Sequence, residues 1–304
     1  MLNLSKLRCG SWALAVLSFP LAAQDLEPRR WSHLPVGGHF LGGGPVVTRG
    51  DILFDPVIRA EDATLDMNTV ALKYIYSFAM LNKSARVSVQ QAHQNGTWSG
   101  LLDGEPATLR RVGATDTTLR FAINLKGAPP LQGGDFLSYR GAASRETIVG
   151  LGLVVQLPTG EYSNDKLINL GSNRFTFRPQ FGAVYRSGDW SLEATAAVSF
   201  FGDNDDFFGE ADREQDPLFY LQGHLIRSLS NGKWFGLSMG YGAGGESSIS
   251  GIDKDDDRDD LGWAFSYGFQ IGRSSLKIAY AGVNTRANTG LDSDSLVLTF
   301  SRGW

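Results

Sequence analysis

The feature that most constrains this chain is an alternation of large apolar residues with small or polar ones at every second position. In the segment 262–272, which reads GWAFSYGFQIG, tryptophan, phenylalanine, tyrosine and isoleucine occupy the odd positions, and glycine, alanine, serine and glutamine occupy the even ones. Because successive side chains of a strand point to opposite faces, this period predicts a β-strand with one apolar face and one small, polar face. A soluble sheet would carry charge on the face that meets water, and this segment does not.

The same period recurs along most of the chain. Clear segments are 70–78, 118–125, 149–157, 174–185, 191–200, 235–242 and 276–281, and weaker ones are 34–48, 84–94, 217–229 and 294–304. Together with the first segment they predict about twelve strands. Many of them reach the roughly nine to eleven residues that a tilted strand needs to cross a bilayer.

The connections between these segments alternate in length. Short turns are predicted at 81–84, 186–189, 230–233 and 272–274, whereas long polar connections run through 202–216 and 244–260. Short turns on one rim and long loops on the other are typical of outer-membrane barrels. The segment 127–145, which contains Pro129 and Pro130, departs from this pattern, and we expect a rim helix or a plug there.

The alternation and the loop lengths together predict an all-β fold, a transmembrane antiparallel up-and-down β-barrel. A closed barrel leaves no unpaired backbone in hydrocarbon, so its apolar face meets lipid and its small polar face lines the lumen. The alternative, a soluble exported β-sandwich, also alternates but explains neither the loop asymmetry nor the weakly charged inner face. The final strand ends at Trp304, which is typical of the signal read by the outer-membrane assembly machinery. Expected partners are that machinery, outer-membrane lipid and lipopolysaccharide.

The N-terminus is typical of an exported protein. Lys6 and Arg8 precede a short apolar run at 12–17 and a small-residue cleavage site, so residues 1–23 are predicted to be a signal peptide. The alternative, a membrane anchor, is disfavoured because the run is too short to span about 30 Å of hydrocarbon. The barrel domain would then be residues 24–304, without Cys9, the single cysteine of the chain.

Other classes of function find little support in the sequence. The net charge of −4 argues against a nucleic-acid partner. Outer-membrane lipid hydrolases use a histidine with a nearby serine, but two residues after His93 stands Asn95, which is no nucleophile. The acidic runs 203–206 and 253–260 are either calcium sites or solvated outer loops, and the second lacks the turn glycine and closing glutamate of an EF-hand. We therefore expect no catalytic residues, no cofactor and no metal site.

Charged residues on the inward parity are the candidate pore-lining residues. A charge on the lipid side would cost roughly 2–4 kcal/mol at the midplane, so the lumen is the favoured location. The candidates are Lys73, Arg86, Arg120, Arg174, Arg178, Glu193 and Lys277. Cations that line a narrow lumen favour anions. The alternative is that these side chains fill a small closed barrel with salt bridges and hydrogen bonds.

Several stretches carry a family resemblance, in order along nearly the whole mature chain. They read FLGGG, GDILFDPV, NTVALKYIYSF, QLPTGEY, KLINLGSNRFTFRPQFG, DNDDFFG, EQDPLFYLQGHLI and GYGAGGES. They resemble the MetA-pathway of phenol degradation family, whose members are outer-membrane channels or transporters often encoded with aromatic-compound catabolism. The resemblance supplies no catalytic residues.

The predicted function is therefore passive passage of small solutes, anionic or aromatic, across the outer membrane of a Gram-negative bacterium. A non-conducting structural or adhesion barrel is the alternative, and a membrane-embedded lipid hydrolase comes third.

Overall fold

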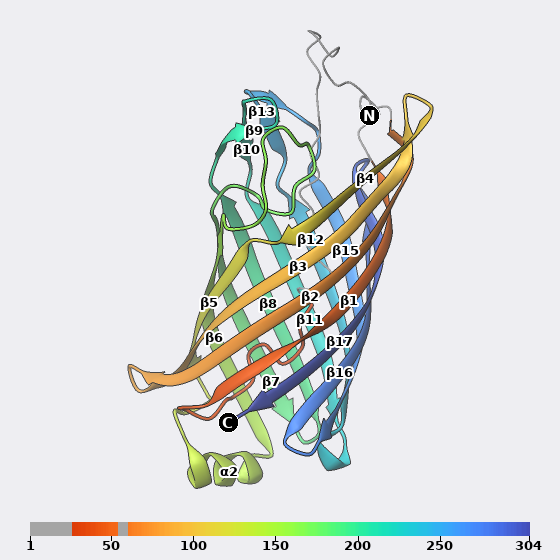
Figure 1. The fold of residues 1–304 in the computed structure, drawn as a ribbon. Helices are drawn as coiled ribbons and strands as arrows, with labels where there is room; N and C mark the ends of the chain where they lie inside the picture. The colour runs from red at the N-terminus through yellow and green to blue at the C-terminus, as the bar shows by residue number, and fades with distance from the viewer. Residues whose placement is uncertain (1–25, 54–59) are drawn as a thin grey trace.

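The computed structural model describes residues 26–53 and 60–304, and it shows a closed, strongly tilted β-barrel (Figure 1). The predicted signal peptide lies outside the described residues. The wall strands are β1 (His39–Leu53), β2 (Ala60–Met80), β3 (Lys83–Leu102), β4 (Glu105–Ala114), β5 (Thr117–Lys126), β6 (Arg145–Leu157), β7 (Thr176–Ser187), β8 (Trp190–Phe201), β11 (Leu218–Ser228), β12 (Trp234–Gly244), β15 (Arg258–Ile271), β16 (Ser274–Thr285) and β17 (Gly290–Gly303).

Each wall strand pairs antiparallel with its neighbours, and the pairing of β2 with β3 closes the sheet. β3 pairs with β5 along Ala85–Gln90 and with β4 along His93–Leu102, so β4 and β5 share one place in the wall. Over the described residues the barrel thus has twelve strand positions. The prediction of an antiparallel barrel of about twelve strands is confirmed.

The period-two pattern explains which side of the wall each residue occupies. In β15, Phe265 is 50% exposed on the outer surface and its neighbour Ser266 is 1% exposed on the inner one. In β11 the same contrast separates Leu221, 60% exposed, from Gln222, 8% exposed. The outward set forms an apolar surface for lipid, because the barrel interior buries the polar set instead.

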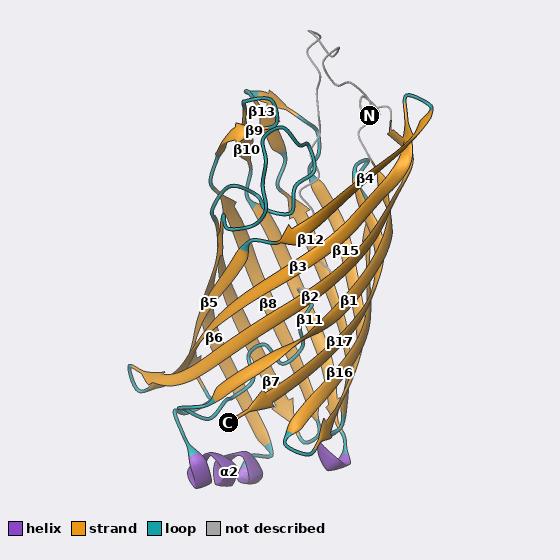
Figure 2. Cartoon of the chain, viewed as in Figure 1, coloured by secondary structure: helices purple, strands orange, loops and turns teal. Residues whose placement is uncertain are grey.

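The two rims differ (Figure 2). One rim carries short turns, the 3-10 turn η3 (Ser230–Gly232), the helix α2 (Gly133–Ala142) and the C-terminus (Figure 1). α2 lies within the segment 127–145, for which a rim helix or a plug was expected. No helix among the described residues is long and apolar enough to cross a membrane.

The opposite rim carries the long loops, which is the extracellular side in outer-membrane barrels. Two of these loops pair into a small sheet of β9 (Asn204–Phe207), β10 (Ala211–Gln215), β13 (Ser247–Ile249) and β14 (Ile252–Asp253). The first acidic run, 203–206, overlaps β9. In the second run, Asp256 accepts hydrogen bonds from the backbone nitrogen and the hydroxyl of Ser247 in β13. Sequence patterning missed this sheet and β4.

Candidate functional site

The first described residues, 26–38, run inside the barrel before β1 begins, and we call them the lumen segment. Its centre is Trp31, which is completely buried. The indole lies against the inward glycines of β6 and β7, and a Cβ placed on Gly182 would come within 1.9 Å of it. The indole nitrogen donates a 2.9 Å hydrogen bond to the hydroxyl of Thr195. These contacts show that the wall is shaped to receive this side chain.

Charged residues of the wall hold the backbone and side chains of the lumen segment. Lys73 Nζ lies 2.6 Å from Glu27 Oε2. Arg86 donates to the carbonyls of Arg30 and Ser32, at 3.1 and 2.7 Å. The carboxylate of Glu193 accepts from the backbone nitrogen of Arg29 at 2.8 Å.

The electrostatics of Glu27 follow from these neighbours. Burial alone would raise the pKa of its carboxyl, but Lys73, Lys277 and Arg30 together hold that pKa well below its usual value. The side chain is therefore a carboxylate at neutral pH, and it offsets the surrounding positive charge.

At the short-turn rim the lumen segment meets α2. His33 Nε2 lies 2.7 Å from the carbonyl oxygen of Pro129, and His33 Nδ1 lies 3.7 Å from Glu146 Oε1. Glu146 also pairs with Arg140 of α2 at 3.0 Å and with Arg186 at 3.6 Å. Burial lowers the pKa of His33, which is therefore neutral at pH 7. Helix, wall and lumen segment thus join around one carboxylate and close this end of the lumen.

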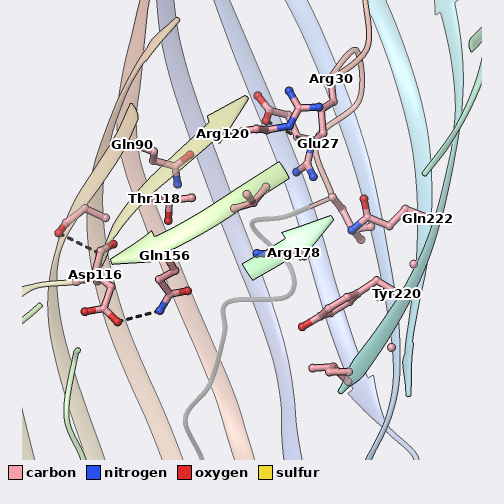
Figure 3. Close-up of a pocket in the computed structure, with 18 of the residues that line it drawn as sticks. Glu27, Arg30, Gln90, Asp116, Thr118, Arg120, Gln156, Arg178, Tyr220 and Gln222 are labelled. Carbon is pink, nitrogen blue, oxygen red and sulfur yellow. Dashed lines mark hydrogen bonds and ion pairs between the residues drawn. The ribbon is translucent and has the colours of Figure 1, made fainter. Parts of the chain in front are cut away.

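A cavity of about 240 Å³ lies between the lumen segment and the long-loop rim (Figure 3). Among the described residues that line it, five side chains are cationic and three are acidic: Arg30, Lys73, Arg120, Arg178 and Arg258 against Glu27, Asp116 and Asp260. Pairing accounts for part of this charge, since Lys73 contacts Glu27 and Arg258 lies 3.4 Å from Asp260. The balance favours an anion in the cavity.

Two of the arginines lie in one row of the wall. Arg120 of β5 pairs with Val154 of β6, which pairs with Arg178 of β7. Two strand spacings place their Cα atoms about 10 Å apart. The guanidinium of Arg178 lies 5.3 Å from the ring centre of Tyr220, and that of Arg120 lies 4.6 Å from that of Trp31. The row therefore offers charge and aromatic surface side by side.

The sequence-predicted candidates fall into three places. Lys73, Arg120 and Arg178 line the cavity. Arg86, Glu193 and Lys277 act on the lumen segment. Arg174 lies apart, just before β7, where it donates to Gln215 and its guanidinium lies 4.6 Å from the ring centre of Phe201. Their role as lining of a conducting pore stays a prediction.

Other cavity residues were missed by sequence reasoning. Tyr220 and Gln222 of β11 lie in a run that was predicted as a strand, and their inward parity was the signal that would have found them. Glu27 and Arg30 precede the first strand, where no alternation of apolar and polar residues predicts which way a side chain points. Asp116 lies at the break between β4 and β5, which the sequence pattern did not reveal.

Comparisons with known proteins agree with this architecture. A crystallised outer membrane channel from Pseudomonas putida F1 is 21% identical, with a TM-score of 0.74 over 92% of this chain and 100% of that one. The transport unit of the autotransporter AIDA-I from Escherichia coli is 10% identical, with a TM-score of 0.51 over 93% of this chain and 94% of that one. The translocator domain of NalP from Neisseria meningitidis is 12% identical, with a TM-score of 0.50 over 90% of each chain. These likenesses show the fold.

Among curated proteins no relative matches. The family model described as MetA-pathway of phenol degradation matches residues 42–300, which is most of the chain. The chain therefore belongs to the MetA-pathway of phenol degradation family, and it is a β-barrel of the outer membrane.

Proposed function

We propose that this barrel passes small solutes passively across the outer membrane and that it prefers compounds with a carboxylate or an aromatic ring. The observation that carries this proposal is the row of Arg120 and Arg178 on the wall of the cavity. A guanidinium binds a carboxylate through two parallel hydrogen bonds, and the neighbouring ring of Tyr220, which also lines the cavity, adds apolar surface. The shared fold of the outer membrane channel from Pseudomonas putida F1 supports passage of solutes, and the family description, which names phenol degradation, supports an aromatic solute.

The chemistry of the cavity suits transfer rather than tight storage. Arg120 is already engaged by Gln180, whose Oε1 accepts from its Nε at 3.1 Å. A solute carboxylate would therefore exchange with wall contacts instead of meeting bare charge. Passage requires binding that is favourable enough to enter and weak enough to leave.

The lumen segment is the obstacle that a conducting state must move. It fills the lumen between the cavity and α2, and Trp31 at its centre has no exposed surface. Its ties to the wall are ion pairs, hydrogen bonds and one packed indole rather than covalent links. Displacement of residues 26–38 from the wall would join the cavity to the periplasmic rim.

The test is electrical. The purified protein in planar bilayers should conduct, and in a salt gradient its reversal potential should indicate preference for anions. Arg178→Gln should lower this selectivity more than it lowers total conductance. Arg227→Gln, which changes an exposed arginine beside Trp190, is the matched control and should change neither. Unchanged selectivity in Arg178→Gln would show that the arginines only fill the barrel interior with salt bridges and hydrogen bonds and do not select the solute.

The alternatives give different results in the same preparation. A structural or adhesion barrel would show no conductance even when the lumen segment is loosened. A lipid hydrolase would release fatty acids from phospholipid vesicles, although His93, the histidine considered for that role, is exposed in the wall without a serine two residues later.

A further inference from the structure

The lumen changes character near the long-loop rim, where its lining becomes apolar. Five buried residues from β1, β2 and β3 pack there into what we call the apolar cluster: Ile52, Ala63, Leu65, Met67 and Trp98. Leu65 and Met67 are 3% and 5% exposed, and the residues between and beside them in β2 are exposed on the outer surface. The cluster thus faces the interior of a barrel whose inner surface elsewhere is rich in buried polar residues.

Residues of the loop between β6 and β7 cover this cluster. Ile168 and Leu170 pack against it from the lumen, and Leu109 and Leu291 adjoin it at its edges.

The covering loop is bonded to the wall at the carboxylate of Asp116 and at the carbonyl of Ala114, which accepts from the backbone nitrogen of Glu161 at 2.8 Å. Asp116 accepts hydrogen bonds from the backbone nitrogens of Gly160 and Ser172, at 2.8 and 2.9 Å, so it holds both ends of the loop. A further bond runs from Arg111 Nε to the carbonyl of Ile168 at 2.8 Å. The middle of the loop is bonded to β9, where Asp206 accepts from the hydroxyl of Tyr162 at 2.8 Å and from the amide of Asn164 at 2.6 Å. The loop can open locally when bonds of this kind break together with those of Asp116.

Leu170 separates the apolar cluster from the polar cavity. It packs against the cluster, and it also lines the cavity together with Asp116 and Arg178. When Leu170 moves, the apolar surface and the cationic cavity become parts of one continuous path.

We propose that the apolar cluster is an entry subsite for the ring of a monocyclic aromatic solute, which takes the place of Ile168 and Leu170 before the solute reaches the arginines. The proposal rests on the function proposed above, which it makes more specific: selection for the ring occurs at the cluster, and selection for negative charge occurs in the cavity. A ring gains from contact with Leu65, Met67 and Trp98 through burial of apolar area, and a small aliphatic ion has no such area to bury.

The test uses thiol labelling with benzoate and acetate as probes, because they carry the same charged group and differ in the ring. In a Cys9→Ser background, Met67→Cys places a thiol in the cluster, and Leu65→Cys is the second reporter if the first folds poorly. Gln222→Cys reports on the cavity instead. Folding is checked by heat-modifiable migration on gels, and labelling is followed with a small methanethiosulfonate reagent.

We expect benzoate to slow labelling of Met67→Cys several-fold and acetate at the same concentration to leave it unchanged. Asp116→Asn, which replaces the acceptor of the loop bonds by a weaker one, should speed labelling of Met67→Cys about tenfold. Absence of protection by benzoate, or equal protection by acetate, would overturn the subsite. Labelling of Gln222→Cys reports separately on the proposed function, since anion binding in the cavity should slow it with either probe.

Discussion

The two ends of the lumen are closed by different means. At the short-turn end the lumen segment is packed into the wall around Trp31, which has no exposed surface and fits against glycines of β6 and β7. At the long-loop end the β6–β7 loop lies over the apolar cluster and is held at both ends by Asp116. One closure resembles a protein core, and the other is a loop held by hydrogen bonds to the wall and to β9.

This difference predicts which end of the lumen opens at the lower free-energy cost. A packed core is close to crystal density, so a buried indole leaves only when many contacts break together. A rim loop that is held by hydrogen bonds near the surface opens locally at a smaller free-energy cost. Solutes should therefore reach the cavity from outside more readily than they leave it toward the periplasm.

The largest effect on conductance is expected from one added methyl group at the short-turn end of the lumen, which we call the packed end. In Gly182→Ala the added Cβ would lie 1.9 Å from Trp31 Cε2 and 2.2 Å from its Nε1, so the indole cannot keep its place. Overpacking of this kind costs about 1–3 kcal/mol, which we expect to loosen the lumen segment and raise single-channel conductance several-fold. Gly223→Ala, where the nearest heavy atom lies 4.0 Å away, is the control. Equal conductance in both variants would contradict a packed closure.

One methyl group at the other end should act differently. In Gly160→Ala the added Cβ would lie 2.7 Å from the backbone nitrogen of Asp116, which pushes the loop from its acceptor. We expect trypsin added from outside to cleave after Lys166 several times faster, and conductance to stay the same. Gly134→Ala, with no heavy atom within 4 Å, is the control. If conductance rises as it does in Gly182→Ala, the covering loop and the lumen segment open together and not independently.

The sequence could predict the wall because the membrane imposes a strict rule on it. Phe265 and Ser266 are adjacent, yet one is half exposed and the other is buried, as their parity requires. Most positions of the strands that cross lipid obey this rule, so the approximate number of strands and their antiparallel order could be predicted from residue type, although β4 was missed. Arg120 and Arg178 could be assigned to the interior for the same reason.

The contents of the lumen follow no such rule. The lumen segment shows no alternation of apolar and polar residues. Its position depends on the fit of Trp31 against glycines more than a hundred residues later in the chain, and a single sequence does not reveal such a contact. Parity predicts Arg174 as a pore-lining residue, but it precedes β7 and donates to Gln215 of β10. The interruption at Asp116 hid β4, because two residues at 115 and 116 separate it from β5.

A smaller effect is expected where the packed end relies on charge. Lys73→Met removes the ion pair with Glu27, whose side chains are 26% and 33% exposed. A partly exposed pair contributes about 1 kcal/mol or less, so the lumen segment should loosen slightly. Channel opening at fixed voltage should rise less than it does in Gly182→Ala. Lys126→Met, which changes an exposed lysine at the end of β5, should leave opening unaltered. An effect as large as that of Gly182→Ala would show that charge, not packing, closes this end.

The smallest effect concerns pH and His33. Burial is the main cause that lowers the pKa of its imidazole, and Arg140 and Arg86 act in the same direction, while the carbonyl of Pro129 and the carboxylate of Glu146 oppose them. A histidine whose pKa in the folded state lies below its unfolded value, about 6.5, contributes full stability above that pH. The contribution is lost as the pH falls through 6.5 toward the folded value, because the undocked segment then binds the proton more tightly.

Acidification from pH 7.5 to 5.5 should therefore loosen the lumen segment, and the opening probability should rise. His33→Gln retains a hydrogen-bond donor toward Pro129 but cannot be protonated, so it should remove this part of the pH dependence. His93→Gln changes an exposed histidine of the wall and should retain it. If His33→Gln opens on acidification as the unmodified protein does, the proton acts elsewhere, and the packed end owes its closure to Trp31 and its glycines alone.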